Sequence, residues 1–61
     1  MGISIDDQIK AVSREIAIRE QVYPQWVRSG RRGFTQQKAD HEIAAMKAVA
    51  ESLHRLKGLE D

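Results

Sequence analysis

The stretch "VYPQWVRSGRRGFTQQ", residues 22 to 37, decides how this chain folds. Pro24 falls inside an apolar helical pattern, where a proline lacks the backbone N–H and clashes with the carbonyl four residues earlier. Trp26 keeps the spacing of that pattern, so we expect a kinked helix that continues past the proline. Gly30 then supplies the left-handed conformation that commonly ends a helix. The stretch therefore predicts a corner between two helices at about residues 29–34.

Before the corner, the sequence predicts a helix over about residues 5–28. Ser4 can cap its first turn, and Asp7 stands three residues later as in a capping box. An apolar stripe then advances in steps of four and three residues, which is the spacing of a helical seam. The residues at the seam positions are Ile5, Ile9, Val12, Ile16, Arg19, Tyr23 and Trp26.

After the corner, a second helix is predicted over about residues 36–57, with Thr35 as its cap. Gly58 is expected to end this helix, and Leu59 to fold back on the last turn. The two helices predict an all-α chain, an antiparallel helical hairpin that forms one domain over residues 1–61. The apolar stripe of the second helix consists of Ala39, Ile43, Met46, Ala50 and Leu53.

The chain is too short to bury a large core. A folded chain of 61 residues removes only about 60% of its unfolded surface from water, and such chains usually need a disulfide, a metal or an oligomer. There is no cysteine, and His41 and His54 follow no ligand spacing. A lone hairpin would also leave Ile18, Val22 and Val49 in water. We therefore expect a homodimer that forms a four-helix assembly.

Arg19 interrupts the apolar stripe, where a charge must be paired or reach out to water. Glu15 lies one turn earlier on the same face, and Glu42 is expected opposite Arg19 across the hairpin. One interpretation is an ion pair that fixes the register of the helices, together with Tyr23 and Pro24. The other is an arginine that contacts a partner.

The corner combines basic and aromatic residues. A run of charge is usually a solvated face, and aromatic residues at helical spacing are usually core. The other interpretation is a binding surface, because Trp, Tyr and Arg dominate interface hot spots. Phe34 either plugs this end of the hairpin or protrudes from it, and Lys38 adds a charge nearby. The predicted partner-binding residues are Trp26, Arg28, Arg31, Arg32 and Phe34.

Charge and motifs exclude several classes of function. Ten Lys and Arg residues against nine Asp and Glu residues do not make a polyanion-binding composition. A helix-turn-helix that reads DNA would need a third helix and a polar recognition helix. The triplet Asp40-His41-Glu42 cannot converge, because consecutive residues of a helix point about 100° apart. We therefore expect no enzyme, no metal site and no cofactor.

The runs "REIAIREQVYPQWVRSG" and "QQKADHEIAAMKAV" carry a resemblance. They match the patterns R-x-x-V-Y-P-x-W-V-x-x-G and K-A-x-x-E-I-x-x-M, over roughly half of the chain. The chain resembles a family of small tailed-phage and prophage proteins, similar in size and architecture to the phage quorum-sensing anti-activator. Its corner "RSGRRGF" is longer and more basic than in that family. The matching residues are Arg19, Val22, Tyr23, Pro24, Trp26, Val27, Gly30, Lys38, Ala39, Glu42, Ile43 and Met46.

The resemblance implies a helical hairpin, often dimeric, that binds and inhibits a host protein, either a regulator or a component of a defence system. No apolar run approaches the ~20 residues that span a bilayer, and no signal peptide is evident, so we expect the cytoplasm of the host bacterium and no membrane partner. The alternative is a small nucleic-acid-binding regulator that places the corner arginines on phosphates. A third possibility is an assembly component of the phage particle.

Overall fold

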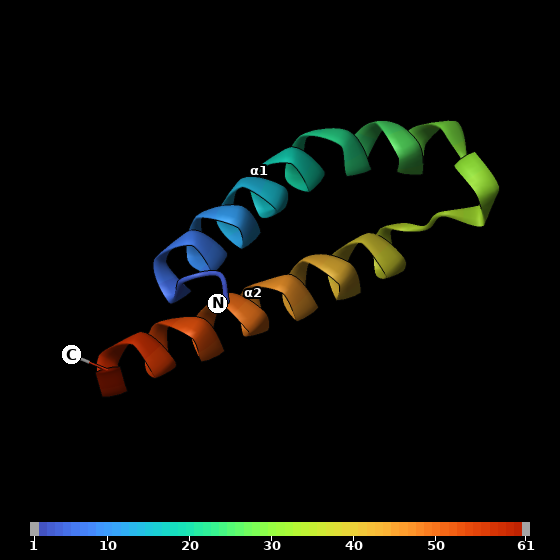
Figure 1. The fold of residues 1–61 in the computed structure, drawn as a ribbon. Coiled ribbons are helices and arrows are strands. Elements are labelled where there is room, and N and C mark those ends of the chain that lie inside the picture. The colour runs from blue at the N-terminus through green and yellow to red at the C-terminus, as the bar shows by residue number, and fades with distance from the viewer. Residues whose placement is uncertain (1, 61) are drawn as a thin grey trace.

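The computed structural model describes residues 2–60, apart from the side chains of Arg32 and Glu60. Helix α1 is Ile5–Ser29, a short 3-10 turn η1 is Arg31–Gly33, and helix α2 is Gln36–Glu60. The two helices run antiparallel and are joined at one end by the corner (Figure 1). The described residues form helices and no strand, so the predicted all-α hairpin is confirmed. The molecule is elongated, measuring 44 × 18 × 17 Å.

Helix α1 begins and ends where its capping residues predict. The Ser4 hydroxyl accepts a hydrogen bond of 3.1 Å from the Asp7 backbone N–H, which satisfies one unpaired donor of the first turn. At the other end, Gly30 adopts the left-handed conformation with φ 65°. Between these caps, α1 runs uninterrupted through Pro24. The chain therefore continues past the proline as one helix, as the position of Trp26 predicts.

Helix α2 begins as predicted but ends later. The Thr35 hydroxyl accepts a hydrogen bond of 3.2 Å from the Lys38 backbone N–H. The predicted end at Gly58 is wrong, because α2 continues to Glu60. Glycine permits the left-handed conformation without imposing it, and a reversal is favoured when the next apolar residue packs on the last turn. Leu59 is 84% exposed and gains no such contact.

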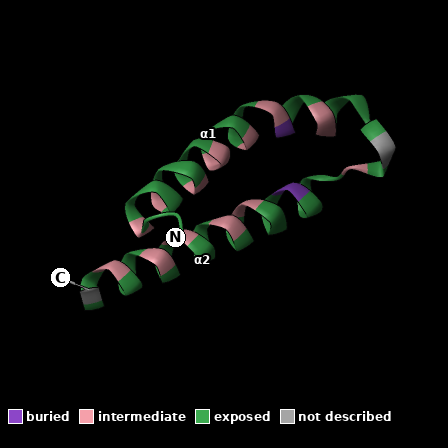
Figure 2. Ribbon diagram, viewed as in Figure 1, coloured by how far each residue is buried: buried purple, intermediate pink, exposed green. Residues whose placement is uncertain are grey.

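The core of the hairpin is one thin seam between the helices. Its buried apolar residues are Tyr23, 4% exposed, and Ala39, 3% exposed, which lie near the corner end (Figure 2). A large ring on α1 thus packs where α2 has a small residue, which suits interdigitation. The other seam residues are half-buried: Ile5, Ile9, Val12, Ile16, Trp26, Ile43, Met46, Ala50 and Leu53.

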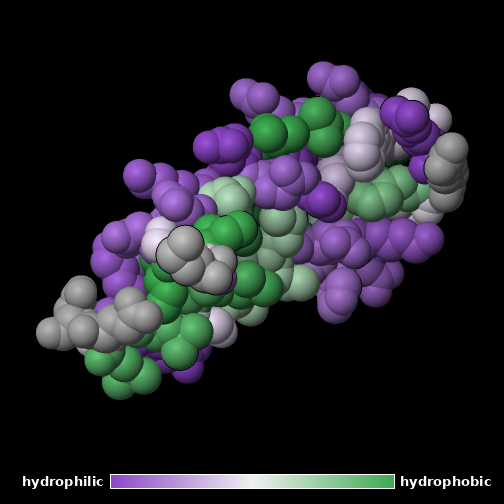
Figure 3. Space-filling model, viewed as in Figure 1, coloured by the Kyte–Doolittle hydropathy of each residue, from purple (hydrophilic) through white to green (hydrophobic). Residues whose placement is uncertain are grey.

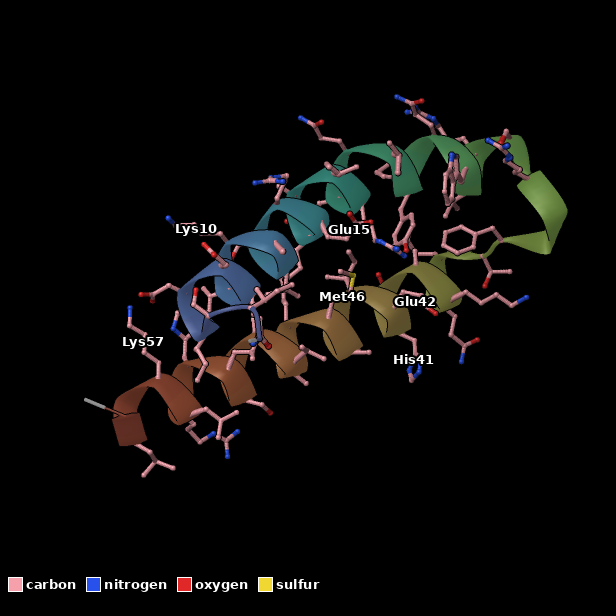
Figure 4. The ribbon with its side chains drawn as sticks, in the orientation of Figure 1. Lys10, Glu15, His41, Glu42, Met46 and Lys57 are labelled. Atoms are coloured by element: carbon pink, nitrogen blue, oxygen red, sulfur yellow. The ribbon has the colours of Figure 1, made fainter. Side chains whose placement is uncertain are left out.

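Among the described side chains, two ion pairs join the helices. Glu20 and Lys47 lie 3.6 Å apart, and Lys57 lies 2.6 Å from Asp6, at the open end of the hairpin (Figure 4). The hydrogen bond and the positive charge of Lys57 lower the pKa of Asp6. That stabilisation is present above the ordinary carboxyl pKa and is lost as the pH falls through the lowered value. Exposed pairs such as these are screened by water and salt, so they align the helices more than they hold them together.

Candidate functional site

The three aromatic residues of the chain meet in one cluster at the corner. Tyr23 and Trp26 come from α1, and Phe34 lies just before α2. The Phe34 ring centroid lies 4.8 Å from that of Tyr23 and 5.7 Å from that of Trp26. The Tyr23 and Trp26 centroids are 5.4 Å apart. The rings are tilted or edge-on, as aromatic pairs prefer. Phe34 therefore closes this end of the hairpin by packing on the other two rings, and it does not protrude.

Two glycines reverse the chain so that Phe34 reaches the other rings. Gly30 and Gly33 have φ of 65° and 69°, in the left-handed region that most side chains disfavour. Between them, η1 turns the backbone. The Phe34 N–H then donates a hydrogen bond of 2.8 Å to the Arg31 carbonyl. The two glycines therefore set the geometry of the corner.

Arg19 holds Tyr23 in place from one turn earlier on α1. Its Nη1 donates a hydrogen bond of 2.7 Å to the Tyr23 hydroxyl, and its Nε donates one of 2.8 Å to the Glu15 carboxylate. The bond to Tyr23, followed by that to Glu15, raises the pKa of Arg19. The prediction that Glu42 pairs with Arg19 across the hairpin is wrong. Glu42 is exposed, and Arg19 forms its ion pair with Glu15. Residues one turn apart meet without crossing between helices, which favours the local pair.

Further basic residues lie at the same end of the molecule as the aromatic cluster, and Arg31 is in contact with it. Arg28, in the last turn of α1, and Arg31, in η1, are both exposed. The Arg31 guanidinium carbon lies 5.4 Å from the centroid of the Trp26 ring. A cation over an exposed indole face contributes about 0.5–1 kcal/mol. The side chain of Arg32, the third predicted arginine, lies outside the described residues.

A small hollow opens where the rings and the cations meet. Trp26, Arg31, Phe34 and Lys38 line its ≈ 220 Å³. Half of its lining is aromatic and half is cationic, so it suits an apolar side chain that lies beside a carboxylate. We call the five residues Trp26, Arg28, Arg31, Phe34 and Lys38 the basic aromatic corner. The sequence predicts all five at this end of the hairpin, with Lys38 as a charge near the predicted binding residues. The structure adds that Lys38 lines the hollow.

The Asp40-His41-Glu42 triplet does not form a site. Asp40 accepts a hydrogen bond of 2.9 Å from the Gln36 side chain on its own helix, and His41 points away from α1 (Figure 4). Within residues 2–60, no three His, Cys, Asp or Glu side chains gather closely enough to hold a metal ion. His41 and Glu42 instead line a second hollow together with Phe34 and Lys38, on the outer side of the corner.

Comparison with protein families, curated proteins and solved structures gives no match for this chain. The resemblance to small phage proteins therefore stays a prediction that rests on the quoted residues. Neither described helix is both long enough and apolar enough to cross a membrane.

Proposed function

We propose that this chain is a phage or prophage accessory protein that binds a host protein and inhibits it through the basic aromatic corner. The supporting observation is the hollow at the corner, where the half-buried rings of Trp26 and Phe34 lie beside Arg31 and Lys38. Large aromatic residues and arginine contribute most of the binding energy in protein interfaces. The phage origin rests on the resemblance in sequence.

The chemistry of the corner defines the partner. Its exposed side chains are cationic, so the matching surface on the partner carries Asp or Glu. Its rings accept an apolar side chain next to that carboxylate. The protein then acts by occupying a surface rather than by catalysis, in the host cytoplasm, and as a homodimer that presents two corners.

A comparison of two charge variants with the wild type tests this proposal. Arg31→Ala combined with Lys38→Ala removes two exposed charges at the hollow and leaves the three rings in place. Lys10→Ala combined with Arg14→Ala removes the same charge from exposed positions on α1, far from the corner. We expect host-lysate protein captured by the wild type to be lost with the corner variant and kept with the α1 variant. The captured protein is then purified and its affinity measured with all three chains.

Equal affinity of both variants for the purified partner would overturn the proposal.

The alternative function, nucleic-acid binding through Arg28 and Arg31, is favoured by the exposed cations at the corner. It predicts an affinity for DNA or RNA that falls steeply with salt, with a log–log slope of about −0.9 per phosphate contacted. The net charge of +1 supports a protein partner instead.

A further inference from the structure

One side of the hairpin carries a line of apolar residues on each helix, all exposed except Val22, which is half-buried. Ile18 is 45% exposed, and Val49 and Leu56 are 51% and 49% exposed. Val22 continues the line on α1, four residues after Ile18, and Ala45 continues it on α2, four residues before Val49. Residues spaced by four or seven lie on one face of a helix. We call these five residues the apolar flank.

The two lines lie on the same side of the molecule. The Glu20–Lys47 ion pair marks the opposite side, because its members reach across from α1 to α2 there. Ile18 is two residues from Glu20, and Val49 is two residues from Lys47, which is about 200° around each helix. Both apolar lines therefore face away from the ion pair. Figure 3 shows this side, where hydrophobic side chains gather over the seam and α2 toward the open end and in a separate group on α1, while hydrophilic side chains cover α2 toward the corner.

The surface of the chain is larger than a compact monomer of its mass should have. The chain exposes 4919 Å². A folded monomer of 6.9 kDa is expected to expose about 4,000 Å², so about 900 Å² is in excess. Each partner of a standard protein interface buries about 800 Å². The excess therefore matches the area that a dimer interface would cover.

The charges on this side favour a second copy of the chain over a charged partner. Glu15 and Arg19 lie on the same face of α1 as Ile18 and Val22. The Glu15 carboxylate and the Arg19 guanidinium form an ion pair at 2.8 Å, so their charges cancel. An acidic or a basic partner would meet no unpaired countercharge on α1 here. On α2 the same face also carries exposed Glu42, seven residues before Val49, and exposed Lys38, seven residues before Ala45. One carboxylate and one cation leave this side without net charge, so it matches a second copy of itself, as a twofold interface requires.

We propose that the apolar flank is the interface for a second copy of this chain, which covers both seams and completes a four-helix core. The inference rests on the proposed function, because it specifies the homodimer included there. It uses none of the residues of the basic aromatic corner. Its failure and the failure of host-protein binding are therefore separate outcomes.

Sedimentation equilibrium of matched charge variants tests the inference. Ile18→Glu and Val49→Glu place a carboxylate on the apolar flank. Ser13→Glu and His54→Glu place one on exposed positions of the ion-paired side, seven residues from Glu20 and Lys47 respectively. We expect the wild type and the two control variants to sediment at twice the 6.9 kDa chain mass. The two flank variants should sediment as monomers.

A milder variant covers the case in which the flank variants lose their helices. Leu56→Ala removes part of the exposed apolar side chain and replaces it with a good helix former. We expect its circular dichroism to stay helical, and its dimer dissociation constant to rise about tenfold. A monomeric wild type, or an equal dimer mass or dissociation constant for flank and control variants, would overturn the inference. A corner variant that dimerises but fails to bind a host protein would leave it standing.

Discussion

Arg19 illustrates what the sequence reveals at the level of single residues. A charge at a seam position predicts a paired arginine, and the structure pairs it. The spacing also predicts Glu15 as a neighbour, one turn away. The hydrogen bond to the Tyr23 hydroxyl depends on the rotamer of a ring that packs against Phe34. No periodicity encodes that rotamer, and a seam position by itself equally predicts a partner across the hairpin.

A double-mutant cycle tests the role of this arginine. Arg19→Met keeps an apolar stem and leaves the Tyr23 hydroxyl without its donor, while Tyr23→Phe removes the hydroxyl. We expect each single variant to lower the free energy of unfolding, and the double variant to lose less than the sum, with a coupling of about 1 kcal/mol. Thermal unfolding at one fixed protein concentration measures it. The cycle with Arg14→Met is the control, and additive losses in both cycles would contradict this role for Arg19.

At the level of the helices, the sequence correctly predicts that there are two helices. It predicts three of their four ends and misses the end of α2. The caps Ser4, Gly30 and Thr35 have side-chain or backbone chemistry that acts within three residues, so the sequence alone places them. Gly58 lacks that local chemistry, because a glycine near a helix end acts as a cap only when a later residue packs back. Tertiary contact decides such an end, and the exposed Leu59 makes none.

The same substitution at two glycines should therefore have opposite effects. Gly30→Ala forces a side chain into the left-handed region at φ 65° and should lower the free energy of unfolding by about 1–2 kcal/mol. Gly58→Ala lies within α2, where an added Cβ meets nothing within 4 Å. It should raise the free energy of unfolding by up to about 1 kcal/mol. Chemical denaturation followed by circular dichroism measures both. A loss at Gly58 would contradict the helical end described for α2.

At the level of the whole molecule, the hairpin has a thin core and two distinct outer surfaces. The apolar stripes predict the antiparallel pairing, and the lack of cysteine and of ligand spacing leads to the expectation of association. The hollow beside Trp26 does not follow from the stripes, because it depends on the backbone turn through Gly30 and Gly33 that brings Lys38 next to the rings. The identity of a partner lies outside the chain, and the charge and shape of the corner define only its chemistry.

The central claim is that this chain completes its core by association with a second copy. Thermal unfolding of the wild type across a hundredfold range of protein concentration tests it most directly. A dimer that unfolds to separated chains gives a Tm that rises with concentration, because mass action favours the associated state. We expect that rise, with helicity and association lost together. A Tm that stays constant across the range would contradict the claim, because it would mean that the isolated hairpin is stable by itself.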